Sequence, residues 1–132
     1  MNGTPRIERV LQMTLAVVAV IFGLATMVAG GRVLAGADPG YIVFLPLLIF
    51  NTVMGALYIV AGFLMWRNPA RGVFAAAAIF LLNLSVFGII GYLHTTGHAI
   101  AIDSFHAMSF RTGVWLILFV GLAGLNRRRR PR

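Results

Sequence analysis

The side chains best suited to chemistry gather in one short stretch of the chain. All three histidines, His94, His98 and His106, lie in this stretch, and Met108 lies two residues after the last of them. Imidazole nitrogens bind copper, zinc and iron, and the methionine thioether suits Cu(I). These four residues are therefore a candidate metal site for copper or zinc. Alternatively, two of the histidines could be the axial ligands of a haem.

Three charged residues accompany this stretch. Asp103 and His106 are one helical turn apart, Arg111 follows, and Asp38 lies in an earlier polar segment. Asp103 could orient a ligating His106, or Asp103, His106 and Arg111 could relay a proton or an anion. In the simplest interpretation the histidines lie at lipid headgroup level and Asp103 caps a helix. Arg111 then extends outwards to the membrane surface or pairs with Asp38, Asp103, a lipid phosphate or another subunit, and no cofactor is the default.

The composition indicates what kind of fold must position these residues. Of 132 residues, 60% are hydrophobic and 11% are charged, whereas a soluble domain is roughly 25% charged. So few charges cannot supply the polar surface of a soluble domain this short, and so many apolar residues exclude disorder. The absence of cysteine excludes disulfides and iron–sulfur clusters. The chain is predicted to be an integral membrane protein.

Four apolar runs are long enough to cross the hydrocarbon core, which takes about 20 helical residues. They cover residues 10–30, 41–66, 72–93 and 104–125, and segments rich in Gly, Pro, Asn and Thr separate them. Asp103 stands where the N-cap of the fourth helix belongs. We expect an all-α integral membrane protein, a single domain over residues 1–132. Its four transmembrane helices should form an up-down-up-down antiparallel bundle, followed by a basic cytoplasmic tail at 126–132.

The arginines predict the orientation of this bundle. One set of arginines flanks the termini and the second connection, namely Arg6, Arg9, Arg67, Arg71, Arg127, Arg128, Arg129, Arg130 and Arg132. Only Arg32 and Arg111 fall on the opposite side. Because cytoplasmic segments carry the excess of positive charge, we expect both termini in the cytoplasm. Arginine without lysine indicates a GC-rich bacterial genome, and hence a bacterial inner membrane.

The net charge of +8 is thereby explained as a topology signal, and no nucleic-acid partner is expected. The run from Arg127 to Arg130 is interpreted as a stop-transfer anchor that also contacts anionic lipid.

Small and polar residues at steps of three and four predict which helix faces pack together, because such residues drive association in lipid. In the first helix they are Gln12, Ala16, Ala19, Gly23, Thr26 and Gly30; in the second, Asn51, Gly55, Tyr58 and Gly62. In the third they are Asn83, Phe87, Ile90 and His94; in the fourth, Asp103, His106, Phe110, Gly113, Ile117 and Gly124.

Asn51 and Asn83 both fall near the middle of the membrane, on helices that should be antiparallel neighbours. A carboxamide in hydrocarbon needs a hydrogen-bond partner. We therefore expect an interhelical bond between the two, or, in a functional interpretation, a polar gate in a permeation path.

No catalytic motif is present, since the chain has no P-loop, G-x-S-x-G or H-E-x-x-H sequence, and no enzyme is expected. Two functions remain open. The first is an accessory, assembly or structural subunit of a larger membrane complex, with an outer-face His/Met/Asp site for a metal or haem. The alternative is a homo-oligomeric channel or a transporter of small solutes or ions.

Overall fold

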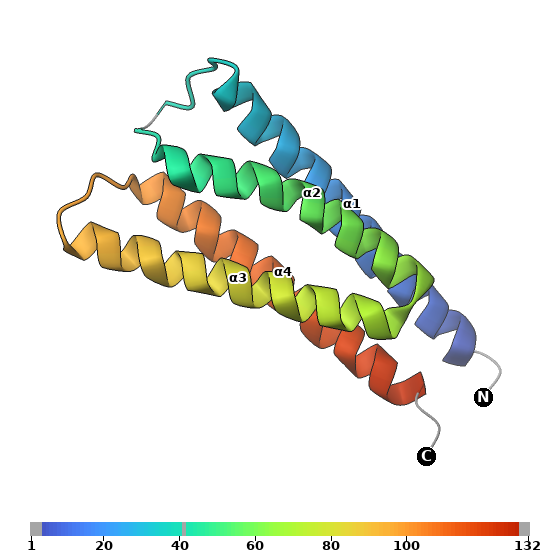
Figure 1. Cartoon of the computed structure of the whole chain (residues 1–132). Helices are drawn as coiled ribbons and strands as arrows, with labels where there is room; N and C mark the ends of the chain where they lie inside the picture. Colours follow the sequence, from blue (N-terminus) through green and yellow to red (C-terminus); the bar gives the residue numbers. More distant parts are fainter. Residues whose placement is uncertain (1–3, 41, 130–132) are drawn as a thin grey trace.

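The computed structural model describes residues 4–40 and 42–129, which form four helices: α1 (Thr4–Leu34), α2 (Leu45–Arg67), α3 (Pro69–Thr95) and α4 (Ile102–Arg129). Each helix is long and apolar enough to span a membrane. Successive helices run in opposite directions, so that the start of α1 and the end of α4 lie at the same end of the bundle (Figure 1). The predicted antiparallel bundle of four transmembrane helices is confirmed.

Most of the helices are longer than the apolar runs that predicted them. α1 begins at Thr4, and α4 continues to Arg129, so Arg127 and Arg128 extend the last helix instead of following it. Arg130 lies outside the described residues. Hydropathy marks only the part of a helix inside hydrocarbon, whereas backbone hydrogen bonding continues into the aqueous layer. α2 begins late, at Leu45, with Pro46 in its first turn, where the missing N–H costs nothing.

The bundle consists of two tightly packed hairpins. α1 packs along α2 and α3 along α4, the hairpins meet through α2 and α3, and α1 and α4 touch little. A Cβ atom on Gly23 of α1 would lie 2.6 Å from the backbone oxygen of Gly55 on α2. Glycine at both positions therefore lets the two backbones approach this closely. The predicted packing face of α1 is confirmed, because every residue on it from Gln12 to Gly30 is buried.

The packing face predicted for α4 is wrong. Phe110 and Ile117 are 64% and 69% exposed. The buried face is instead formed by Ser104, Met108, Trp115, Leu118, Leu122 and Leu125. Where the other helices present small buried residues, such as Ala16, Ala61 and Ala76, large side chains from α4 help to fill the space. A Cβ atom on Gly72 of α3, for example, would lie 2.8 Å from Cδ2 of Leu122.

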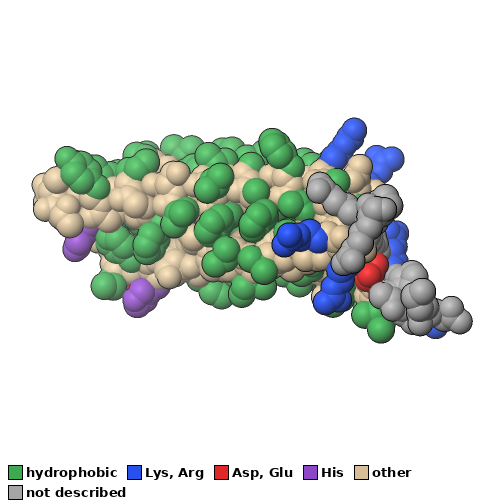
Figure 2. Space-filling view, turned by 90° about the horizontal axis from the view of Figure 1, so that it is seen from below, with side chains coloured by type: hydrophobic (Ala, Val, Ile, Leu, Met, Phe, Trp, Pro, Cys, Tyr) green, Lys and Arg blue, Asp and Glu red, His purple; other side chains and the backbone are tan. Residues whose placement is uncertain are grey.

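The two ends of the bundle differ in charge. Figure 2 shows arginines gathered at one end, histidines at the other and apolar side chains between them. We call the first the terminal end, because α1 starts and α4 ends there, and the second the loop end, because residues 35–44 and 96–101 connect helices there. At the terminal end, Nε2 of the buried Gln12 donates to the carbonyl oxygens of Met65 and Trp66, both at 2.8 Å.

Candidate functional site

The structure does not gather the predicted metal ligands into a site. The side chains of His94, His98 and His106 are exposed, whereas Met108 is fully buried. The ring of His94 packs edge-on against Phe105, with the ring centres 5.2 Å apart. Met108 lies in an apolar cluster with Leu47, Ile90 and Ile100. Within residues 4–40 and 42–129, no three His, Asp or Glu side chains are placed so as to hold a metal ion.

The two loop-end carboxylates lie apart from Arg111. Asp38 accepts a hydrogen bond from the backbone N–H of Gly40 at 2.9 Å. Asp103 is exposed within the first turn of α4, which begins at Ile102, so Asp103 is not the predicted N-cap. The structure gives Arg111 a different partner from either acid.

Arg111 points into the bundle and not to the membrane surface. Its Nη1 donates to Oγ1 of Thr26 on α1 at 3.2 Å, while its Nε is buried without a hydrogen-bond partner in the described chain. Gly30, one turn from Thr26, packs against Thr52 of α2. Thr26 therefore lies about 15 Å below the start of α2, at 1.5 Å per residue. Thr26 and Arg111 both lie within the apolar spans of their helices, so the guanidinium is inside the membrane-spanning part of the bundle.

Side chains from all four helices meet at this depth in what we call the polar layer: Thr26, Tyr58, Asn83 and Arg111. The Tyr58 hydroxyl donates to Oδ1 of the fully buried Asn83 at 3.1 Å. The Arg111 guanidinium lies within electrostatic reach of the Tyr58 hydroxyl. The polar layer thus runs as a chain of contacts from α1 through α4 and α2 to α3.

The predicted bond between Asn51 and Asn83 is not formed. Asn83 pairs with Tyr58, and Oδ1 of Asn51 has no partner among the described residues. Helical side chains lean towards the N-terminus of their own helix. In antiparallel helices, Tyr58 and Asn83 therefore lean towards each other, whereas Asn51 leans away towards the loop end.

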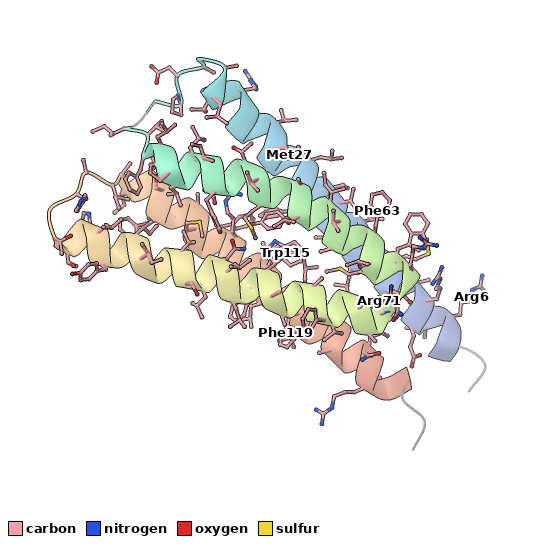
Figure 3. All side chains as sticks on the ribbon, viewed as in Figure 1. Arg6, Met27, Phe63, Arg71, Trp115 and Phe119 are labelled. Carbon is pink, nitrogen blue, oxygen red and sulfur yellow. The ribbon has the colours of Figure 1, made fainter. Side chains whose placement is uncertain are left out.

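Below the polar layer the bundle is closed by aromatic and aliphatic side chains. Trp115 is fully buried, and its ring centre lies 4.9 Å from that of Tyr58. Figure 3 shows Trp115 between the helices, whereas Phe63 lies on the outer surface, 53% exposed. Towards the terminal end the interior is filled by large, buried side chains, among them Met65, Leu118 and Leu122.

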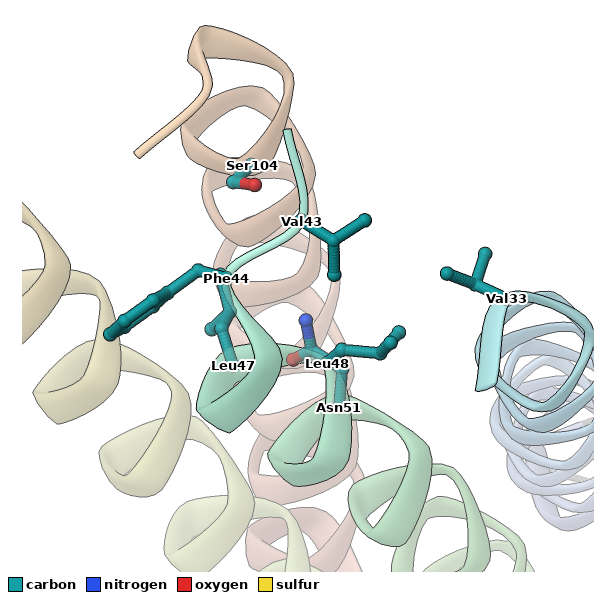
Figure 4. Close-up of a pocket in the computed structure, with 7 residues that line it drawn as sticks. All are labelled: Val33, Val43, Phe44, Leu47, Leu48, Asn51 and Ser104. Atoms are coloured by element: carbon teal, nitrogen blue, oxygen red, sulfur yellow. The ribbon is translucent and has the colours of Figure 1, made fainter. Parts of the chain in front are cut away.

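Above the polar layer lies a cavity of ≈ 200 Å³ that we call the loop-end pocket. Its lining residues come from α1, α2, α4 and the first loop: Thr26, Ala29, Gly30, Val33, Pro39, Leu47, Leu48, Asn51, Ser104, Ala107 and Arg111. Figure 4 shows a smaller pocket of ≈ 40 Å³ that shares Val33, Leu47, Leu48, Asn51 and Ser104 with the loop-end pocket; the amide nitrogen of Asn51 points there towards the loop end. The polar lining groups include one cation, Arg111, and no carboxylate.

A second hollow, of ≈ 210 Å³, adjoins the pocket on the membrane-facing side of α1 and α4. We call it the α1–α4 groove. It is lined by Phe22, Ala25, Thr26, Ala29, Ala107, Phe110 and Arg111. Thr26, Ala29, Ala107 and Arg111 line both hollows, so pocket and groove meet at the guanidinium.

The pocket therefore presents hydrogen-bond donors from Arg111, Asn51 and Ser104, which complement an anionic oxygen acid. The sequence pointed to Arg111 and Asn51 as polar residues inside spans. Ser104 lies two helical turns from Arg111 on the same face of α4, but it was not predicted to be a site residue. Tyr58 was predicted only to pack, although a tyrosine on a buried helix face needs a hydrogen-bond partner.

No protein-family model matches the chain, and no match is found among curated proteins or among solved structures. The chain is a four-span helical membrane protein.

Proposed function

We propose that this protein binds an acidic group, a carboxylate or a phosphate, in the loop-end pocket. The proposal rests on Arg111, which lies within a membrane span with its Nε unpaired in the described structure and no carboxylate in the pocket lining. An arginine inside a span is costly, up to roughly 2.5–3.5 kcal/mol at the helix centre on insertion scales. A bound anion would offset that cost, and intramembrane ionisable residues mark functional sites.

The other polar groups in the pocket support an acceptor as the ligand. Asn51 directs its amide nitrogen towards the loop end, and the buried Ser104 contributes a hydroxyl. Together with the guanidinium these groups offer several N–H and O–H donors around one small cavity. Donors to a charged acceptor form the stronger class of hydrogen bonds.

The protein is further proposed to be a non-catalytic accessory or assembly subunit of a larger complex in a bacterial inner membrane. Its described helices carry almost no chain beyond the spans and their two loop-end connections, which leaves little but the lipid-facing surface for contacts. We place both termini in the cytoplasm, since the arginines gather at the terminal end. The loop-end pocket then lies in the outer leaflet.

A metal or haem site and a proton relay are less well supported. His94, His98 and His106 are exposed, whereas Met108 is fully buried. Asp103 and His106 lie on the surface of α4, whereas Arg111 lies in the interior. These placements separate the groups that either mechanism would need to combine.

A homo-oligomeric channel or transporter is the second candidate, favoured by the polar layer that crosses all four helices. Fully buried Trp115, Met65 and Leu122 close the interior towards the terminal end, so a solute would have to pass between copies. Flux into liposomes that is unchanged by Asn83→Leu and Arg111→Ala would count against this candidate.

The proposal is tested with amphiphiles of equal chain length and opposite charge. Trp66 and Trp115 are the two tryptophans, so Trp66→Phe leaves Trp115, below the pocket, as a single fluorescent reporter. In neutral lipid nanodiscs we expect laurate, but not dodecyltrimethylammonium, to change this fluorescence saturably.

Two variants complete this experiment. Arg111→Gln should weaken laurate binding at least about tenfold, as loss of a charged hydrogen bond predicts. Arg32→Gln removes the same charge from an exposed loop-end position and should leave binding unchanged. Equal responses to both amphiphiles, or no effect of Arg111→Gln, would overturn the proposal.

A further inference from the structure

We infer that the occupant of the loop-end pocket is a single-chain acidic amphiphile that reaches Arg111 sideways from the bilayer, with its chain in the α1–α4 groove. This inference rests on the proposed function and adds the class of ligand and its route. A free anion and an acidic amphiphile share the acidic head, and only the amphiphile carries a hydrocarbon chain.

The size of the pocket is the first argument. Sites for complete small molecules usually measure about 300–1,000 Å³, and the loop-end pocket measures ≈ 200 Å³. It has room for a head group and a short stretch of chain, since a cavity of about 150 Å³ holds a benzene molecule. Any larger ligand must therefore continue outside the pocket.

The groove supplies the space for that continuation. It holds a further ≈ 210 Å³ and meets the pocket at Arg111. Apart from Thr26 and Arg111, its lining is Phe22, Ala25, Ala29, Ala107 and Phe110, which suits hydrocarbon. A polar head at the guanidinium and an apolar tail in the groove is the pattern of an amphiphile.

The arrangement of the helices provides the route. α1 and α4 touch little, in contrast to the two tight hairpins, and the side chains of Ala25, Ala29 and Phe110 at the groove are exposed to the membrane side. A molecule dissolved in the bilayer therefore reaches the groove without passing through water. A groove of this size between two helices has room for one hydrocarbon chain. Arg111, which has no counter-ion in the pocket lining, pairs with one acidic head.

The inference is tested by varying the length of the ligand's hydrocarbon chain. In the Trp66→Phe protein in neutral nanodiscs, we titrate inorganic phosphate, acetate, butyrate, octanoate and laurate against Trp115 fluorescence. Expressed as aqueous concentrations, each methylene moved from water into the bilayer or groove is worth roughly a threefold to fourfold gain, so laurate should act at least about a hundredfold more tightly than butyrate. This saturable response should be lost in Arg111→Gln protein, whereas a response caused by partitioning of the acid into lipid alone would not change. A dibrominated stearate should quench Trp115, and laurate should reverse the quenching.

A groove-filling variant provides an independent check. Ala25 lines the groove but not the loop-end pocket, so Ala25→Phe should weaken laurate binding at least about tenfold. Ala78→Phe adds the same side chain at an exposed position of α3 and should leave laurate binding unchanged. The titration with acids of increasing chain length uses the Trp66→Phe protein, so it still tests the inference if Ala25→Phe does not fold.

The outcomes separate the inference from the proposed function. If phosphate and acetate bind as tightly as laurate and all three need Arg111, the ligand is a free anion; the inference is overturned and the proposed function stands. If no acid of any length binds in an Arg111-dependent way, the proposed function itself is overturned. If dibrominated stearate quenches Trp115 equally in Arg111→Gln protein, the chain does not depend on the head, and the inference fails.

Discussion

At the scale of single residues, the interior contains a charge and several polar groups that a purely structural bundle does not need. Arg111 reaches Thr26 inside the span, and Asn83 bonds to Tyr58 across α2 and α3. The two contacts differ in kind. The Tyr58–Asn83 bond joins two neutral groups and leaves Nδ2 of Asn83 without a partner in the described structure, whereas Arg111 is a cation whose Nε has none there.

Replacing Arg111 should therefore separate stability from binding. Arg111→Met keeps much of the side-chain volume and removes the charge, and such replacements of buried ions are neutral or stabilising by about 1–4 kcal/mol. We expect the ligand-free protein to unfold in detergent mixtures with an equal or larger free energy, while laurate binding is lost. A loss of more than about 1 kcal/mol would assign Arg111 a structural role.

The Tyr58–Asn83 hydrogen bond should show a measurable coupling energy. In a double-mutant cycle of Tyr58→Phe and Asn83→Leu, the coupling should be about 0.6 kcal/mol, the average for such bonds in membrane proteins. Tyr92→Phe is the matched control, because Tyr92 is 69% exposed, and it should leave the unfolding free energy unchanged. Additive single effects would mean that the bond contributes nothing.

At the scale of the helices, close packing is concentrated within the hairpins. Gly23 and Gly55 bring α1 and α2 into backbone contact, while α1 and α4 touch little and leave the groove between them. The site therefore lies where the bundle is least tightly packed, and the rigid hairpins on either side hold its polar groups in position.

Gly23→Ala should destabilise the α1–α2 hairpin. The new Cβ would lie 2.6 Å from the backbone oxygen of Gly55, so the helices must separate, and overpacking of this kind costs about 1–3 kcal/mol. Gly88→Ala on α3 is the control, since its Cβ would meet no atom of the described chain within 4 Å. Alanine is the better helix former, so this control should be neutral or stabilising. Unfolding of both variants in the same detergent mixture compares them; equal stability would refute the close contact.

At the scale of the whole molecule, charge divides the bundle into two unlike ends. Arginines surround the terminal end, and the histidines lie at the loop end (Figure 2). Between them the surface is apolar, as a protein embedded in lipid requires. The loop-end pocket lies towards the end with few charges. The orientation of the protein in the membrane therefore decides which leaflet contains the pocket.

Single cysteines report that orientation directly, because the chain has none of its own. Ala37→Cys and Ala99→Cys lie in the exposed loop-end connections, and Asn68→Cys lies in the exposed turn between α2 and α3. Since positive charge is retained in the cytoplasm, a membrane-impermeant maleimide should label positions 37 and 99 in intact cells. Position 68 should react only after permeabilisation. The reverse pattern would place the termini outside.

Much of the fold was predictable from periodicity and composition. The four spans followed from apolar length, and the packing face of α1 followed from small and polar residues at helical spacing. The same rule failed for α4, because it favoured Gly113 and Gly124 over Trp115 and Leu122. The neighbouring helices decide where large side chains are needed to fill gaps. The sequence pattern of one helix therefore does not predict that it supplies them.

The sequence by itself determined the membrane class, the number of spans, the antiparallel order and the asymmetry of charge, since each depends on residues within one segment or at its ends. Only the tertiary structure decided the partners of the polar residues. Asn83 bonds to Tyr58 instead of Asn51, and Arg111 reaches Thr26 instead of Asp38 or Asp103. These pairings depend on the direction in which each side chain leans and on which helices touch, and both are fixed only when the two hairpins pack together.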